Sequence, residues 1–137
     1  MNANKIEVSV VVDAPTLKVW DYYTNPMHIV HWNFADPSWH CPSAENEMVV
    51  GGRYQTRMEA KDGSMGFDFI AFYTMIKMGE CFEYEFGDRK AMVVFNALEN
   101  GTEVVVTFDP ETIHSVELQK AGWQSILNNF KIYTESN

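Results

Sequence analysis

The sequence predicts an α+β fold: a curved antiparallel sheet of about seven strands wrapped around a long carboxy-terminal helix, with two short helices after the first strand. From Arg53 to Phe108, apolar and polar residues alternate with a period of two, and tight-turn residues separate the runs, which indicates β-hairpins. Further on, Trp123, Ile126 and Phe130 recur at the spacing of one helix face. A helix face this aromatic after a run of hairpins predicts a sheet that grips the helix and encloses a pocket.

The amino-terminal elements are expected to be a strand and two short helices. Residues 5–12 alternate apolar and polar side chains, as in a half-buried strand. Asp13 and Pro15 then indicate a helix start, with the Asp13 carboxylate as its cap and the proline in the first turn. Pro26 ends this helix, because a residue before proline is pushed out of helical geometry. A second short helix is expected over residues 27–32.

The middle of the chain is expected to be an irregular loop followed by a meander. Residues 33–47 show no period, so a loop is predicted there, and a short strand is predicted to end at Gly51-Gly52. Five strands follow, and in one of them an inward-facing row runs from Phe67 to Met75. Asn100-Gly101 is predicted to form a two-residue hairpin turn in which both residues take positive φ.

The last helix is expected to start at Ser115, which can act as its cap, and to run to about Glu135. Gly122 inside this helix costs about 1 kcal/mol relative to alanine. We therefore expect Gly122 to mark a close approach of the helix to the sheet or to a bound molecule.

Length and charge limit the classes of protein to which the chain can belong. Its 137 residues predict one domain over 1–137, and the formal net charge of −9 makes nucleic acid and anionic membranes unfavourable partners. No leader is recognisable over 1–7, and no apolar run is long enough to span a membrane. Two cysteines cannot form a disulfide framework, so the cytoplasm is the expected compartment.

Short motifs in a fixed order resemble one known family over about residues 6–135. These motifs are Val12-Asp13-Ala14-Pro15, Val19-Trp20, Trp32, Gly51-Gly52-Arg53-Tyr54, Asp62-Gly63, Gly101-Thr102 and Gly122-Trp123 with Ile126-Leu127. They resemble the activator-of-heat-shock-ATPase-like family of the START and pollen-allergen-like (SRPBCC) superfamily. The resemblance implies a helix-grip fold with a hydrophobic cavity between the sheet and the last helix.

The same resemblance implies a range of functions. Superfamily members bind lipids, sterols, polyketides or plant hormones, and some catalyse cyclisation or hydroxylation. The eukaryotic namesake stimulates a chaperone ATPase as part of a larger, two-domain protein. This chain corresponds to one such domain.

Large apolar side chains on the sheet rows and on the last helix are predicted to face each other across the cavity. Pockets of about 300–1,000 Å³ are lined in this way, with a few polar tips that orient the ligand. Phenol and indole groups can supply those tips. The expected lining residues are Trp32, Trp39, Tyr54, Met58, Phe67, Phe69, Tyr73, Phe82, Tyr84, Phe86, Trp123, Leu127 and Phe130.

Metal and nucleophilic chemistry have weaker support in the sequence. His28, His31, His40 and Cys41 lie near one another in the chain, but the adjacent pair chelates poorly and the spacing of a four-ligand zinc site is missing. Cys41 beside His40 is a candidate nucleophile without an orienting group, and Cys81 is expected to point outward. We therefore assign no catalytic residue, no metal and no cofactor.

Three functions are compatible with these observations. The first is a binding protein for a hydrophobic or amphipathic small molecule. The second is a cyclase- or hydrolase-like enzyme that uses Tyr and His groups of the same cavity as acid and base. The third is a protein-interaction module, monomeric or homodimeric, with an unidentified partner, which an exposed apolar patch would support.

Overall fold

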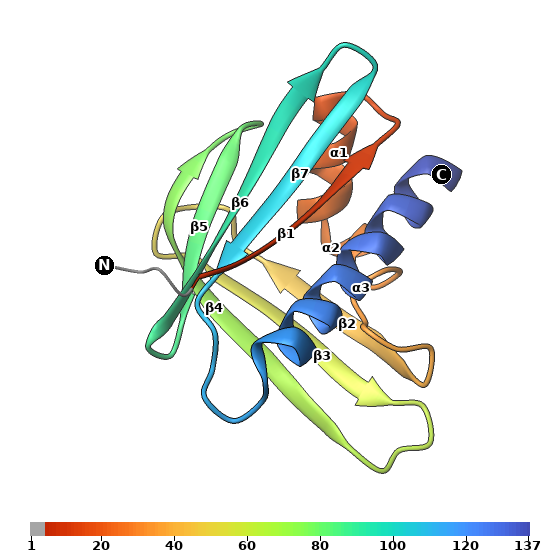
Figure 1. Ribbon diagram of the computed structural model, residues 1–137, viewed down its shortest axis with the longest axis vertical. Helices are drawn as coiled ribbons and strands as arrows, with labels where there is room; N and C mark the ends of the chain where they lie inside the picture. The colour runs from red at the N-terminus through yellow and green to blue at the C-terminus, as the bar shows by residue number, and fades with distance from the viewer. Residues whose placement is uncertain (1–4) are drawn as a thin grey trace.

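The computed structural model describes residues 5–137 and confirms the predicted fold, a seven-stranded antiparallel sheet curled around a long carboxy-terminal helix (Figure 1). Residues 1–4, which belong to the segment expected to lack a leader, lie outside the described residues. In chain order the elements are β1 (Ile6–Val12), α1 (Thr16–Thr24), α2 (Pro26–Ile29), β2 (Trp39–Asn46), β3 (Arg53–Ala60), β4 (Gly66–Lys77), β5 (Cys81–Phe86), β6 (Arg89–Leu98), β7 (Gly101–Phe108) and α3 (Val116–Ser136).

The strand order brings the two ends of the chain to the same side of the sheet. The order is β1-β7-β6-β5-β4-β3-β2, so β2 to β7 form consecutive hairpins and β1 joins the sheet beside β7. Ile6 pairs with Phe108 and Val12 with Thr102 at the two ends of this ladder. Helices α1 and α2 connect β1 to β2 across the full width of the sheet, and Figure 1 shows them at one end of the curl.

Helix α3 starts as predicted and lies along β1, an edge strand of the sheet (Figure 1). Ser115 is its cap, and the Ser115 hydroxyl accepts a hydrogen bond of 3.1 Å from the backbone N–H of Leu118. Gln124 and Lys131 donate hydrogen bonds of 3.0 and 2.6 Å to the carbonyl oxygens of Ser9 and Val11 on β1. The helix therefore covers backbone groups that an edge strand otherwise leaves unpaired.

The loop expected over residues 33–47 is confirmed for residues 33–38 and wrong for Trp39–Asn46, and the strand end expected at Gly51-Gly52 is also wrong. β2 occupies Trp39–Asn46 and pairs only with β3, with a register shift between His40 and Ser43. Pro42 lies in this bulge, which explains why the sequence pattern hides the strand. Proline has no N–H to donate, so it is tolerated at a bulge of an edge strand but breaks the alternation that indicates a strand.

The hairpin between β6 and β7 exists, but the positive φ predicted at its centre is wrong. Leu98 pairs with Gly101, so the turn is centred on Glu99 and Asn100. Over residues 5–137 every residue with positive φ is a glycine, which rules out that conformation for Asn100. Glycine is needed at position 101 for another reason: a Cβ there would lie 2.5 Å from the carbonyl oxygen of Val12.

The inward-facing row of β4 is also shorter than predicted. A register shift between Tyr73 and Met75 inserts an extra residue relative to β5, so the alternation reverses after it. Ile76, instead of Met75, packs against the core. The Met75 sulfur lies 4.0 Å from the Cys81 thiol, which is half-buried.

Three predictions about helix ends and helix packing are wrong as well. Pro15 is the cap residue of α1 and no side chain caps it, while the backbone N–H of Asp13 donates to the Glu135 carboxylate at 2.8 Å. Helix α2 ends at Ile29, earlier than expected. Apart from Gly122 itself, its chain neighbours and the adjacent backbone of α3, no atom lies within 4 Å of a Cβ built on Gly122, so this residue does not mark a close approach of α3 to the sheet. None of the helices within residues 5–137 is long and apolar enough to cross a membrane.

Replacing Thr102 by valine should destabilise the protein by about 1–3 kcal/mol, because the change leaves the buried carbonyl oxygen of Ala14 without its hydrogen-bond donor. The fully buried Thr102 hydroxyl donates to the carbonyl of Ala14 at 2.9 Å and lies 3.1 Å from the Thr16 hydroxyl. Urea unfolding measures the loss. The matched control is Thr107→Val on the outer face of the same strand, which should change stability by no more than about 0.5 kcal/mol. Equal losses in both variants would contradict this role for Thr102.

Candidate functional site

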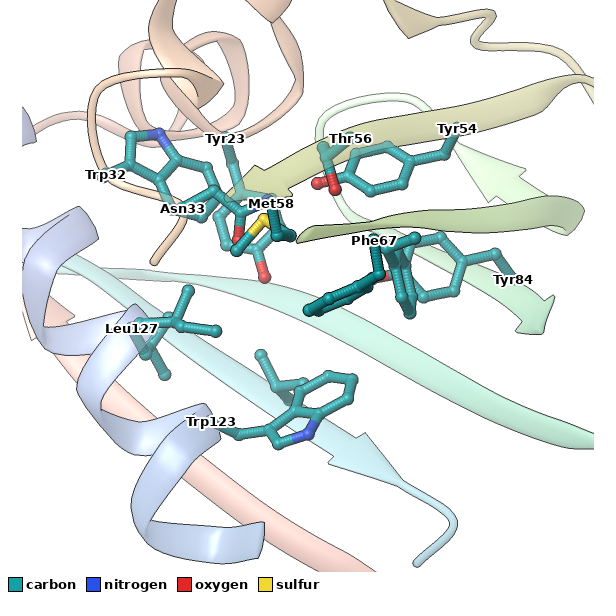
Figure 2. A pocket seen from close by; sticks show the side chains of 13 residues that line it. Tyr23, Trp32, Asn33, Tyr54, Thr56, Met58, Phe67, Tyr84, Trp123 and Leu127 are labelled. Atoms are coloured by element: carbon teal, nitrogen blue, oxygen red, sulfur yellow. The ribbon is translucent and has the colours of Figure 1, made fainter. Parts of the chain in front are cut away.

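A pocket of about 200 Å³ lies between the sheet and α3. Strands β3, β4, β5 and β7 provide one wall, α1 and the residues after α2 provide an end, and α3 provides the opposite wall (Figure 2). The pocket exists because α3 follows β1 and leaves part of the concave face of the sheet uncovered. Its lining residues are Tyr23, Trp32, Asn33, Tyr54, Thr56, Met58, Phe67, Phe69, Tyr84, Val106, Trp123, Ile126 and Leu127.

Most of the residues that the sequence predicts for the cavity line this pocket. They come from the inward rows of β3, β4 and β5, from the segment after α2 and from the inner face of α3, and Figure 2 shows them around a common space. Ligand binding by these residues stays a prediction. They are Trp32, Tyr54, Met58, Phe67, Phe69, Tyr84, Trp123 and Leu127.

The remaining predicted residues do not line the pocket. Phe82 and Tyr73 are buried in the core against each other, with ring centroids 5.5 Å apart. Phe130 is fully buried beneath Trp32 at 5.0 Å. Phe86 is buried with its ring centroid 5.2 Å from Phe69 and 6.2 Å from Trp123. Trp39 is half-buried on β2, with its ring centroid 6.0 Å from that of Phe67. Neighbouring rings fill the space in front of the four buried residues, which are Tyr73, Phe82, Phe86 and Phe130.

Five lining residues were not predicted, and the sequence indicates some of them. Thr56 lies in the same inward row as Tyr54 and Met58, and Ile126 lies on the same helix face as Trp123. The strand period of two and the helix period of 3.6 could therefore have identified these two residues as lining residues. Val106 alternates with Val104 and Phe108 on the inward face of β7, so its period indicates burial as well. Only the tertiary fold brings the remaining two, from α1 and the segment after α2, to the pocket: Tyr23 and Asn33.

The wall of the pocket is a continuous set of aromatic contacts. Tyr84 has ring centroids 5.4 Å from Tyr54 and 6.0 Å from Phe69. On the helix side, Trp123 stacks on Phe108 of β7 at 3.9 Å with an interplanar angle of 11°, which fixes the indole between helix and sheet. Phe67 is 51% exposed while lining the pocket, so this ring lies at its mouth.

Hydrogen bonding divides the six tyrosines of the chain into two groups. The three that do not line the pocket all have a partner: Tyr22 donates to the Asn137 carbonyl, Tyr73 donates to the Asn46 side chain at 2.6 Å, and the Tyr133 hydroxyl lies 2.7 Å from His28 Nδ1. The other three line the pocket, and within residues 5–137 no hydrogen bond involves their hydroxyls. They are Tyr23, Tyr54 and Tyr84.

The surroundings of these phenols keep them protonated. Burial raises the pKa of Tyr54 and of Tyr23 well above the ordinary value, and the neighbouring Tyr84 raises both further. Burial raises the pKa of Tyr84 as well. The Thr56 hydroxyl, on a residue only 1% exposed, also has no hydrogen-bond partner in the described part of the chain. At neutral pH the polar groups of the lining are therefore uncharged: the three phenols, the buried Thr56 hydroxyl and the Asn33 amide.

The candidate nucleophile from the sequence is not placed for catalysis. Cys41 is 3% exposed, and burial raises the pKa of its thiol to about 11, although hydrogen bonding with Ser43 and Asn33 acts in the opposite direction. His40 Nε2 lies 3.8 Å from a Glu59 oxygen. A thiol with a pKa this high is almost entirely protonated at neutral pH and is a poor nucleophile.

The histidines near α2 pack against aromatic rings. His28 stacks on Tyr22 with centroids 3.8 Å apart, and His31 stacks on Tyr133 at 5.3 Å. These contacts join α1, α2 and the end of α3. Within residues 5–137, no three His, Cys, Asp or Glu side chains come close enough to hold a metal ion together.

A curled antiparallel sheet that grips a carboxy-terminal helix over an apolar pocket defines the helix-grip class of proteins. A family model described as Activator of Hsp90 ATPase homolog 1-like protein matches residues 13–135. The chain therefore belongs to this family, as the motifs in its sequence indicate.

Solved structures agree with this assignment. The solution structure of the AHSA1-like protein from Aeromonas hydrophila is 39% identical, with a TM-score of 0.91 over 96% of this chain and 92% of that one. A protein from Cytophaga hutchinsonii is 48% identical, with a TM-score of 0.84 over 98% and 94% of the two chains. A protein from Chromobacterium violaceum, 21% identical over 98% and 99% of the two chains, shares the fold with a TM-score of 0.86. No curated protein matches the chain.

The buried phenols predict that stability falls at alkaline pH. Tyrosine ionises near pH 10 in an unfolded chain, whereas burial raises the pKa of Tyr54, Tyr73 and Tyr84 in the native state. Above about pH 10 the unfolded state therefore binds fewer protons than the native state, and the free energy of unfolding decreases as pH rises. Urea unfolding between pH 8 and 11 should show this decrease, with a shallower slope in Tyr84→Phe. A flat profile to pH 11 would contradict the burial of these groups.

The two cysteines should differ strongly in reactivity. Iodoacetamide at pH 7.5 should modify the half-buried Cys81 first, because Cys41 is inaccessible and its raised pKa lowers the thiolate fraction by about 100-fold relative to an ordinary thiol. Mass spectrometry of tryptic peptides over time gives both rates. In urea the two rates should converge. Faster labelling of Cys41 in the native protein would show that its environment is not the one described.

Proposed function

We propose that this protein binds a small hydrophobic or amphipathic molecule in the pocket between the sheet and α3. The observation that carries the proposal is the pocket itself, because aromatic and aliphatic groups from seven separate elements or segments converge on one space. Binding sites for small molecules are concave and mostly apolar, with a few polar groups that orient the ligand. The unpartnered hydroxyls of Tyr23, Tyr54 and Tyr84 are groups of that kind.

The volume of the pocket sets the size of the ligand. At about 200 Å³ it is smaller than the range of about 300–1,000 Å³ typical of sites for drug-sized molecules. It has the room of about seven water molecules in the liquid. A single or fused pair of rings fits this space, whereas a sterol or a long acyl chain requires the pocket to widen. Phe67 at the mouth is the side chain that such widening would move first.

The composition of the lining favours binding over acid–base catalysis. A general acid or base works best when its pKa lies near the working pH. Among the lining residues, all of which belong to the described segment 5–137, none carries a carboxylate, an imidazole or an amine. Its titratable groups are tyrosines whose pKa burial raises further from neutrality.

A pocket-filling variant tests the proposal. Ile126 lines the pocket on α3, and Ile126→Trp should fill part of it, whereas Ile132→Trp adds the same ring on the exposed side of the same helix, where Ile132 is 64% exposed. Naphthalene titrated into the ¹⁵N-labelled protein should cause saturable shifts of the Trp123 indole and Thr56 amide signals. Ile126→Trp should weaken this binding by at least about tenfold, a loss of about 1.4 kcal/mol, and Ile132→Trp should leave it unchanged.

Two results would count against the proposal. One is the absence of saturable shifts in the unmodified protein. The other is equal binding by both tryptophan variants, which would place naphthalene elsewhere on the molecule. Circular dichroism of both variants checks that they are folded, so that a loss of binding in Ile126→Trp reports on the pocket alone.

A further inference from the structure

We infer that the ligand is an uncharged ring compound with a carbonyl oxygen, held by the hydroxyl groups of Tyr23, Tyr54 and Tyr84. This inference rests on the proposed function, because it assigns chemistry to the same pocket. It starts from the division of the tyrosines: each one outside the pocket has a hydrogen-bond partner, and each one lining it has none within residues 5–137.

The three hydroxyls reach the pocket from different directions. Tyr23 comes from α1, Tyr54 from β3 and Tyr84 from β5, and Figure 2 shows the Tyr23 oxygen pointing into the space in front of Leu127. The Tyr23 ring is held at 4.9 Å from Phe130 and 5.0 Å from Trp32. Packing therefore fixes the direction of this hydroxyl, and an arrangement of this kind is prepared for a partner inside the pocket.

The three phenol hydroxyls have no partner within residues 5–137, so each is free to bond an acceptor on a ligand. A phenol O–H is a hydrogen-bond donor, and a carbonyl oxygen has two lone pairs, so one ligand oxygen can accept from two of these groups. The Thr56 hydroxyl, in the same row as Tyr54, is also unpartnered, but it is buried in the wall on a residue that is only 1% exposed. Phenol donors from α1, β3 and β5 thus line one largely apolar space.

Charge excludes ionised ligands. An ion buried in an apolar site needs a partner of opposite charge, and burial without one costs several kcal/mol. None of the lining residues, which all lie within 5–137, carries a formal charge at neutral pH. The net charge of −9 also repels a carboxylate as it approaches. A neutral acceptor satisfies the hydroxyls without this penalty.

A series of probes with one ring system and different head groups tests the inference on the unmodified protein. The probes are naphthalene, 2-acetylnaphthalene, 2-naphthoate and 2-naphthylmethylammonium, measured by the same NMR titration. We expect 2-acetylnaphthalene to bind about ten times more tightly than naphthalene, as two hydrogen bonds of ordinary strength would produce. The two ions should bind more weakly than naphthalene. Tighter binding of either ion than of the ketone would overturn the inference.

Phenylalanine variants locate the donors. Tyr23→Phe, Tyr54→Phe and Tyr84→Phe each remove one hydroxyl with almost no change in volume, and at least two of them should reduce the preference for ketone over naphthalene by about threefold or more. The matched control is Tyr73→Phe, whose hydroxyl donates to Asn46 outside the pocket and whose loss should leave the preference unchanged. An equal preference in all four variants would overturn the inference.

An infrared measurement gives an answer that does not depend on any variant folding. The carbonyl stretch of bound 2-acetylnaphthalene should move from its position in hexane towards its position in an alcohol, because hydrogen bonds to the oxygen weaken the C=O bond. A stretch that stays at the hexane position means that no hydroxyl contacts the carbonyl. Failure of the proposed function is distinct: in that case naphthalene itself gives no saturable shift, whereas failure of this inference leaves naphthalene bound and the ketone no tighter.

Discussion

The attachment of α3 along β1 is the interaction on which the rest of this structure depends. β1 is an edge strand, and α3 bonds to its carbonyls through Gln124 and Lys131 while Trp123 stacks on Phe108 of the neighbouring strand. A helix held at one edge cannot also pack closely on the inner faces of β3 and β4. The uncovered part of the concave face is the pocket, so the contacts that stabilise the fold also create the site.

The wall of that site combines two properties that rarely occur together. Its aromatic rings contact one another as tightly as a core, as the short distances of Tyr84 to Tyr54 and Phe69 show. Its phenol groups nevertheless have no partner in the described chain, although buried polar groups in proteins are usually hydrogen-bonded. We therefore propose that these hydroxyls bind a ligand.

Membership in the Activator of Hsp90 ATPase homolog 1-like family constrains the fold more than the function. A shared fold hosts many activities, and the residues of the site decide among them. In this chain the deciding residues are Tyr23, on a short helix, and Tyr54 and Tyr84, on the sheet. Their neutral hydroxyls suit the recognition of a small uncharged molecule. The described lining residues include no carboxylate or imidazole that could act as a general acid or base near neutral pH.

Local patterns determined the strands with clean alternation, the aromatic face of α3 and its Ser115 cap, because period and capping depend on neighbouring residues alone. They also indicated Tyr54, Met58 and Trp123 as lining residues. They failed at Pro42 and at the bulge after Tyr73, where one extra residue shifts the alternation and only the pairing with the next strand shows where.

What the sequence by itself determined about this protein is therefore its elements, their inward faces and its family. Only the tertiary structure decided which inward residues meet empty space, because rings packed in front of Tyr73, Phe82 and Phe130 close the core there. It also brought Tyr23 and Asn33 into the site, since the long connection from β1 to β2 carries them across the sheet. The physical reason is that period sets the direction of a side chain, whereas the volume left in front of it depends on contacts between residues far apart in the chain.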